Sequence, residues 1–179
     1  MSEGIYYLTE KDFEIRQNTK GNLLGLSSES NGMNLILFYS KECKFCDDLL
    51  AQFKQLPRLI LGCKFGMLNI NHYHNVIEMS KNTISPITYV PDLILYVNGL
   101  PYMRYDGSNT KDAIKDFIID IHQKLQKVKF VSNEEGQGGV QVENNIAIDL
   151  PEYTIGKPLY GCDAKTGKCY LDFNEAYNS

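Results

Sequence analysis

The stretch that decides the fold of this chain is Tyr39-Ser40-Lys41-Glu42-Cys43-Lys44-Phe45-Cys46. An apolar run of strand length, residues 34–38, comes before it, and residues 47–56, whose apolar side chains have helical spacing, come after it. The order predicts a Cys-x-x-Cys pair at a strand-to-helix junction. Free N–H groups and the dipole at a helix N-terminus stabilise a thiolate, and a thiolate is the form of cysteine that attacks a disulfide.

The two cysteines of this motif are one helical turn apart. Cys46 can therefore attack a mixed disulfide formed at Cys43 and release the partner molecule. This order of events predicts dithiol redox chemistry. A zinc site is the alternative, because thiols in a non-exported protein are expected to stay reduced unless they are catalytic or bound to metal.

Length and composition indicate a globular protein with a sizeable core. The chain has 179 residues, of which 43% are hydrophobic and 22% charged. No run approaches the roughly 18 apolar residues that a membrane span needs. The first residues contain no basic segment followed by an apolar one, so we expect no secretion by a signal peptide.

The net charge of −4 is unevenly distributed along the chain. Residues 1–128 hold 14 basic and 14 acidic side chains, whereas residues 129–179 hold 4 and 8. Neither part has the basic face that nucleic-acid binding requires, so we exclude that class of function.

Local patterns predict alternating strands and helices up to residue 126. A short strand, residues 5–8, is expected before a helix that begins at Thr9, with Asp12 completing a capping box, and before a loop that reaches residue 34. Asn98-Gly99 between two apolar runs indicates a hairpin. The other predicted elements are strands 34–40, 63–71, 92–97 and 102–105 and helices 44–56, 72–82 and 108–126.

Residues 5–126 resemble the thioredoxin family. The likeness lies in the helix start Leu8–Phe13, the Cys-x-x-Cys after a strand, Leu68–Asn71 before a helix, and Tyr89–Gly99, which is similar to the family's cis-proline strand and the turn behind it. The resemblance implies an α/β protein with the thioredoxin fold, in which helices flank a central mixed β-sheet.

The resemblance also implies a role for each matched residue. Cys43 would be the attacking thiolate and Cys46 the resolving thiol of a redox-active centre that needs no cofactor. The Val90–Pro91 bond would be cis, and the Val90 backbone would pair with an extended protein substrate in a groove that Gly107 borders. In this family the cis-proline keeps metal away from the dithiol, so we expect no metal site.

Several residues depart from the family pattern. Glu42 stands where tryptophan is usual, and Lys44-Phe45 stand where Gly-Pro is familiar. Lys44 favours the Cys43 thiolate and Glu42 opposes it, which leaves the direction of the pKa shift open. Leu37 stands where the family has a buried acid that assists proton transfer, so we expect slow or atypical disulfide reduction.

The C-terminal part of the chain differs from the rest in composition and in predicted structure. We predict a thioredoxin-like domain over residues 1–127 and an acidic, extended, β-rich tail over residues 128–179, with a strand at 128–131, a Gly-rich linker at 132–139 and a β-ribbon over 140–150. Six turn-prone residues separate Cys162 from Cys169, so a hairpin can bring these two cysteines face to face. A disulfide, two free thiols and a metal site are the alternatives for this pair.

Two functions follow from these patterns. The first is a thiol–disulfide oxidoreductase, an enzyme acting on protein thiols and disulfides through Cys43 and Cys46. The alternative is a structural or adaptor protein, for example a virion component, that docks partners through its tail. The abundance of Asn, Ile, Tyr and Lys favours an AT-rich genome such as those of some large DNA viruses, and we expect the protein in the cytoplasm or in a virus particle.

Overall fold

A five-stranded mixed sheet forms the centre of the protein. The computed structural model describes residues 4–27, 30–134 and 161–170. Strand order across the sheet is β1-β5-β4-β7-β8. The first three strands of that order are parallel, and the last two are antiparallel to their neighbours. In chain order the strands are β1 (Ile5–Tyr7), β4 (Met33–Tyr39), β5 (Cys63–Asn69), β7 (Asp92–Val97) and β8 (Leu100–Tyr105).

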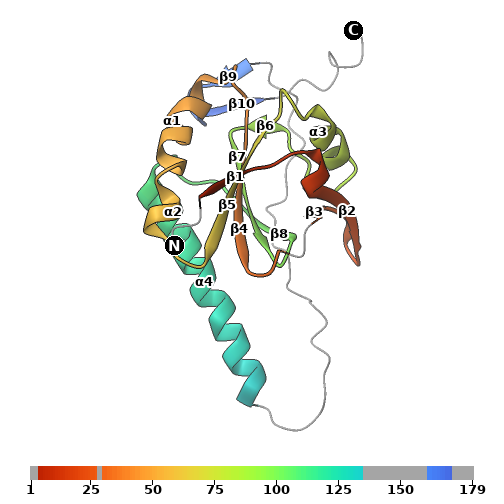
Figure 1. The fold of residues 1–179 in the computed structure, drawn as a ribbon, viewed down its shortest axis with the longest axis vertical. Helices are drawn as coiled ribbons and strands as arrows, with labels where there is room; N and C mark the ends of the chain where they lie inside the picture. The colour runs from red at the N-terminus through yellow and green to blue at the C-terminus, as the bar shows by residue number, and fades with distance from the viewer. Residues whose placement is uncertain (1–3, 28–29, 135–160, 171–179) are drawn as a thin grey trace.

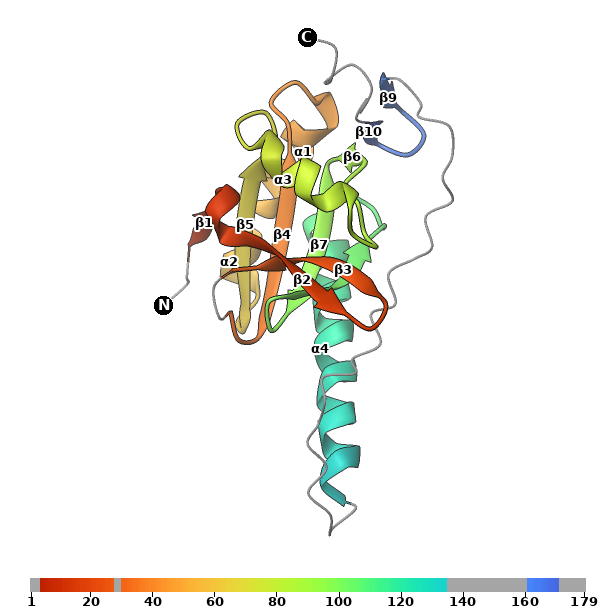
Figure 2. The ribbon, with the colours of Figure 1, turned by 90° about the vertical axis from the view of Figure 1, so that its right-hand side faces the viewer.

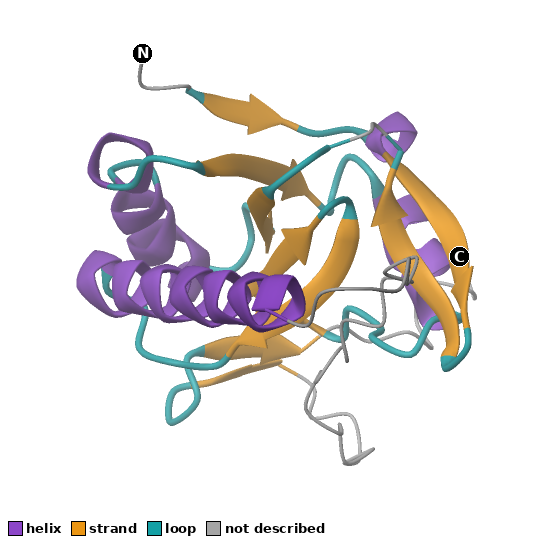
Figure 3. Ribbon diagram, turned by 90° about the horizontal axis from the view of Figure 1, so that it is seen from below, coloured by secondary structure: helices purple, strands orange, loops and turns teal. Residues whose placement is uncertain are grey.

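Two apolar layers cover the sheet, one on each face (Figures 1 and 3). On one face lie the helices α1 (Lys44–Phe53), α2 (Leu56–Leu59) and α4 (Lys111–Glu134), whose buried side chains contact Leu35 and Leu37 of β4. On the other face lie α3 (His74–Lys81) and the hairpin of β2 (Phe13–Asn18) and β3 (Gly21–Leu26). Their side chains contact Ile36 and Phe38, because successive strand residues point to opposite faces.

The predicted helix after Thr9 and the loop to residue 34 are wrong. The capping contact does form, since the Thr9 N–H donates to Asp12 Oδ2 at 2.7 Å, but it closes only the short 3-10 turn η1 (Glu10–Asp12). The chain then enters the β2–β3 hairpin, where buried Phe13 packs on the Phe38 ring at 5.8 Å between centroids. Long-range burial therefore outweighs the local helix signal, because a cap supplies no apolar face of its own.

The last helix is longer than the sequence predicts. α4 continues to Glu134, so the predicted strand at 128–131 is wrong and the helix crosses the expected domain boundary at 127/128. Residues 111–134 contain neither glycine nor proline, and nothing in them stops a helix already anchored by buried Ile114, Ile118 and Ile121. The predicted ribbon over 140–150 lies outside the described residues. No helix in the described part of the chain is long and apolar enough to span a membrane.

The Asn98-Gly99 turn joins β7 to β8 as the sequence predicts. Val97 pairs with Leu100, so the loop has two residues, and both have positive φ, 51° at Asn98 and 78° at Gly99. Turns of this kind match the right-handed twist of the two strands. The Gly99 carbonyl also accepts a 2.8 Å hydrogen bond from the Leu26 N–H, which ties the turn to β3.

Gly99→Ala should lower the free energy of unfolding by about 1–2 kcal/mol, because a side chain opposes the left-handed conformation. Equilibrium unfolding in urea measures this change. Gly4→Ala is the matched control: a Cβ atom at Gly4 has no neighbour within 4 Å, so the free energy should stay within about 0.5 kcal/mol. Equal effects of the two substitutions would contradict the role given to the turn.

Candidate active site

The cysteine motif lies where the central strand β4 ends and α1 begins. Cys43 is the N-cap residue of α1, and its N–H donates to the Ser40 carbonyl at 3.3 Å. The Ser40 hydroxyl accepts a hydrogen bond from the Glu42 N–H at 3.1 Å, which tightens this turn. The strand-to-helix junction expected from the sequence is therefore present, and the first-turn N–H groups of α1 face Cys43.

Cys43 and Cys46 form an asymmetric pair of thiols. Both are free and buried, with exposed fractions of 3% and 0%. A hydrogen bond from the Cys46 side chain lowers the pKa of Cys43 to about 7; backbone hydrogen bonds from Cys46 and Phe45 add to this effect, while burial opposes it. The same side-chain hydrogen bond, with burial, raises the pKa of Cys46. At neutral pH the first cysteine is thus the one that can attack.

Hydrogen bonds contribute more to this asymmetry than the charges that the sequence singles out. Lys44 and Glu42 are both exposed, and Lys44 Nζ lies 5.0 Å from the centroid of the Phe45 ring. Asp47, exposed in the first turn of α1, is a charge that raises the pKa of both Cys43 and Cys46. Leu37 is fully buried in the apolar layer beneath α1.

The short strand β6 (Tyr89–Val90) lies beside the cysteines. The Val90–Pro91 peptide bond is cis. The thiol of Cys43 donates to the Val90 carbonyl over 3.6 Å, so the Cys43 sulfur lies next to the backbone that precedes Pro91. Gly107 is exposed, and the Tyr105 ring lies so close to it that no side chain would fit without displacing that ring.

The C-terminal hairpin pairs with this same strand. β9 (Gly161–Asp163) and β10 (Lys168–Tyr170) are antiparallel, with Cys162 directly opposite Cys169. β10 in turn pairs antiparallel with β6, with Cys169 opposite Val90, so the three strands form a small sheet in the order β6-β10-β9 (Figure 2). Cys169 is disulfide-bonded. The sequence indicates the hairpin but contains no signal for where it docks.

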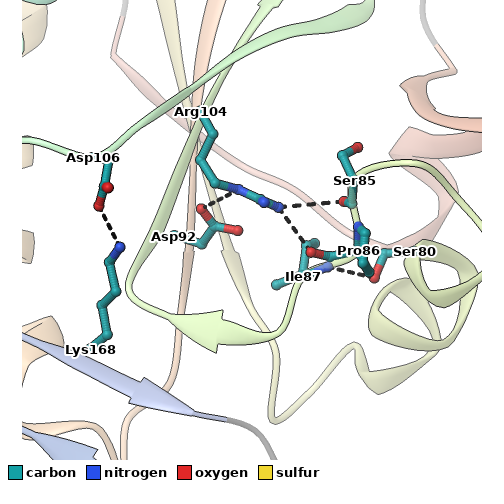
Figure 4. A network of polar contacts seen from close by, with 8 residues as sticks. All are labelled: Ser80, Ser85, Pro86, Ile87, Asp92, Arg104, Asp106 and Lys168. Carbon is teal, nitrogen blue, oxygen red and sulfur yellow. Dashed lines mark hydrogen bonds and ion pairs between the residues drawn. The ribbon is translucent and has the colours of Figure 1, made fainter. Parts of the chain in front are cut away.

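A buried ion pair is connected to the segment that leads into β6 (Figure 4). Arg104 Nε lies 3.0 Å from Asp92 Oδ1, and both side chains are fully buried. Arg104 Nη2 also donates to the carbonyls of Pro86, at 3.0 Å, and Ser85, at 3.4 Å, in the segment that leads into β6. Burial raises the pKa of Asp92 to about 6, although the charge of Arg104 opposes the rise.

Sequence reasoning assigned no role to Arg104 or to Asp92. One signal was available, because Asp92 and Arg104 each interrupt an apolar strand run at a position that faces the core. Two opposite charges on neighbouring buried strands are expected to pair. Among the residues that the structure describes, no group of three or more His, Cys, Asp or Glu side chains is arranged to hold a metal ion.

Fold and site together define a dithiol protein in which a Cys-x-x-Cys helix meets a cis-proline strand. The family model for thioredoxin matches residues 17–120, more than half of the chain. The chain belongs to the thioredoxin family.

Two relatives come from invertebrate iridescent viruses. Uncharacterized protein 196R of Invertebrate iridescent virus 6 is 29% identical over 149 residues, covering 83% of this chain and 76% of its own length. Uncharacterized protein 020R of Invertebrate iridescent virus 3 is 27% identical over 183 residues, covering 99% and 98%. The crystal structure of ERdj5 form I shares the fold, with a TM-score of 0.51 and 14% identity, over 68% of this chain and 14% of that longer one.

Cys46→Ala should raise the pKa of Cys43 by about 1–2 pH units, because a hydrogen bond to a charged group is worth about 1.5–3 kcal/mol. Ultraviolet thiolate absorbance against pH measures the change in a protein whose Cys63, Cys162 and Cys169 are all replaced by serine. The parent should titrate near pH 7. Cys46→Ser is the matched control, since a hydroxyl can still donate, and should shift the titration less. An unchanged midpoint in Cys46→Ala would contradict the role of this hydrogen bond.

Arg104→Met should lower the free energy of unfolding at neutral pH by about 3–5 kcal/mol, because it leaves the Asp92 carboxylate buried without its partner. The folded-state pKa of Asp92 is already above its unfolded value, so its ionised form opposes folding and protonation relieves the penalty. Because the charge of Arg104 lowers the pKa of Asp92, its loss raises that pKa further. The deficit should therefore shrink as pH falls toward about 6 and stay constant below that pH, where Asp92 is protonated in both folded proteins. Denaturant unfolding across this pH range measures it.

The double variant Asp92→Asn/Arg104→Met is the control for this effect. It removes both charges, so it should recover part of the lost stability at neutral pH and should not show the same pH dependence. A deficit in Arg104→Met that is the same at every pH would show that the penalty does not come from the Asp92 carboxylate.

Proposed function

We propose that this protein is a thiol–disulfide oxidoreductase that acts on protein disulfides through Cys43 and Cys46. The observation that carries the proposal is the pairing of a thiol whose pKa is lowered to about 7 with a buried second thiol one turn along α1. The Val90 backbone, which precedes the cis peptide bond and faces Cys43, supports it further. Membership of the thioredoxin family is consistent with this chemistry.

The reaction would proceed in two exchanges. The Cys43 thiolate attacks one sulfur of the substrate disulfide, and the other substrate sulfur leaves as a thiolate. Cys46 then attacks Cys43, which releases the substrate as a dithiol and leaves a Cys43–Cys46 disulfide. In the first exchange Cys43 loses its negative charge, so the hydrogen bond that raises the pKa of Cys46 weakens and Cys46 ionises more easily.

The second exchange lacks a positioned general base. Leu37 is fully buried and apolar at the position where the thioredoxin family has a buried acid. Without a positioned base, general-base assistance of roughly 10²-fold or more is missing from the deprotonation of Cys46. We therefore propose that resolution, rather than attack, limits turnover.

An adaptor that docks partners through its tail is the second candidate. The observation that favours it is the pairing of β10 with β6, because the hairpin covers the backbone that a substrate segment would use. An adaptor of this kind needs no turnover. We propose a location in the cytoplasm or in a virus particle, which the two iridovirus relatives support.

Reduction of a disulfide-bonded protein such as insulin, with dithiothreitol as donor, separates the two candidates. The variant Cys162→Ser/Cys169→Ser should reduce insulin disulfides faster than the donor alone, and adding Cys43→Ser should return the rate to the donor's background. Cys63→Ser is the matched control, because Cys63 is buried on β5 with its pKa raised to about 12, and should leave the rate unchanged. If the Cys162→Ser/Cys169→Ser variant reduces insulin no faster than dithiothreitol alone, the adaptor is favoured.

A further inference from the structure

The C-terminal hairpin occupies the place of an extended substrate at the candidate active site. β10 adds to β6 as an antiparallel strand, with Cys169 opposite Val90 and Tyr170 opposite Tyr89. The carbonyl of Val90 also lies 3.6 Å from the Cys43 sulfur. Residues directly opposite one another in such a pair are about 4.5–5.5 Å apart between Cα atoms. The Val90 backbone is therefore next to both the Cys43 sulfur and the backbone of Cys169.

The side chains of Cys43, Cys46 and Cys169 are buried in the same apolar cluster. This cluster contains Cys43, Cys46, Val90 and Cys169, and Cys169 is only 8% exposed. Directly opposed residues of an antiparallel pair point to the same face of the sheet, so the Cys169 side chain lies on the same face as that of Val90, which packs in the cluster with Cys43 and Cys46. The pairing thus buries Cys169 in the cluster that contains the dithiol.

Contacts next to Cys169 hold the strand in this register. The Lys168 ammonium forms an ion pair with Asp106, the residue that follows β8 (Figure 4), and lies 4.4 Å from the centroid of the Tyr89 ring on β6. A Cβ atom at Gly167 would stand 3.8 Å from the Asn109 side chain. The turn and β10 are therefore fitted to the surface around the site.

The oxidation states of the two cysteine pairs differ in a way that permits exchange. Cys43 and Cys46 are free thiols, whereas Cys169 is disulfide-bonded and stands in register with Cys162. A reduced dithiol beside a disulfide is the arrangement from which thiol–disulfide exchange starts.

We propose that Cys162 and Cys169 form a second redox-active pair, an internal disulfide substrate that takes two electrons from Cys43 and Cys46. The Cys43 thiolate attacks the Cys169 sulfur, the Cys43–Cys169 bond forms, the tail disulfide breaks and Cys162 leaves as a thiolate. Cys46 then loses its proton and attacks Cys43, the Cys43–Cys46 bond forms and Cys169 leaves as a thiolate. The first pair is oxidised, the tail is reduced, and the steps are reversible. This inference rests on the proposed redox chemistry of Cys43.

Trapping the intermediate tests the proposal. Cys46→Ser in the full chain, with Cys63 also replaced by serine, cannot complete the second exchange. The protein is equilibrated in a glutathione redox buffer, quenched with acid, alkylated and digested without reduction. Mass spectrometry should then find peptides that link Cys43 to Cys169, with Cys162 alkylated. The same protein carrying Cys43→Ser is the matched control and should show only the tail disulfide.

A second variant tests the register. Lys168→Ala removes the contacts with Asp106 and Tyr89. Because an exposed ion pair stabilises only weakly, its loss should slow formation of the Cys43–Cys169 link by about two- to fivefold. An unchanged rate would contradict the docking geometry. A link from Cys43 to Cys162 instead of Cys169 would contradict the assignment of the attacked sulfur.

The result that would overturn the proposal is a tail disulfide that stays intact in Cys46→Ser while Cys43 is fully alkylated. The insulin assay of the Cys162→Ser/Cys169→Ser variant then tells two failures apart. Turnover in that assay would mean that the oxidoreductase function stands and only the internal exchange is wrong. Turnover at the donor's background would mean that the proposed redox chemistry of Cys43 has failed as well.

Discussion

The register of β4 against its two neighbours is the constraint on which the rest of the site depends. β4 pairs in parallel with β5 and antiparallel with β7, and each residue from Met33 to Phe38 has a partner on both sides. Because the side chains alternate in direction, a shift of one residue would move each β4 side chain from one apolar layer to the other. The fixed register opposes Phe38 to Asp92 and so brings the chain before Asp92 alongside the loop after Tyr39. Cys43 and Val90 meet for this reason.

The buried pair of Asp92 and Arg104 adds a second constraint at the same place. An ion pair that is fully buried gains little net stability over apolar side chains of similar size, since both charges lose their hydration. The pair instead fixes the relative position of two segments. The guanidinium of Arg104 is planar and has several donors, so it connects β7, through Asp92, to the carbonyls of Ser85 and Pro86. Loss of the pair would therefore disturb the position of β6, the strand with which β10 pairs.

Elements with strong periodicity, or with an unambiguous turn, could be predicted from the sequence. The run before Cys43, the helix after it and the Asn98-Gly99 turn are defined by residues adjacent in the chain. The β2–β3 hairpin could not be predicted, because Thr9 and Asp12 give a real local helix signal and only packing against Phe38 overrides it. At the site, the sequence was enough to select Cys43, Cys46 and Val90. The hydrogen bond that makes the pKa of Cys43 lower than that of Cys46 depends on side-chain geometry, which the sequence does not show. The docking of β10 on β6 pairs residues that are far apart in sequence, and no short pattern encodes it.

The docked hairpin also decides where the small sheet ends. Without β10, one side of β6 would expose unpaired N–H and C=O groups next to a reactive thiol, and such an open edge is a template for pairing with another chain. β10 satisfies those groups and transfers the open edge to β9, which is three residues long. Short edge strands resist pairing with other chains. The tail therefore gives the protein protection from edge-to-edge self-association at the very point where its backbone would be most receptive.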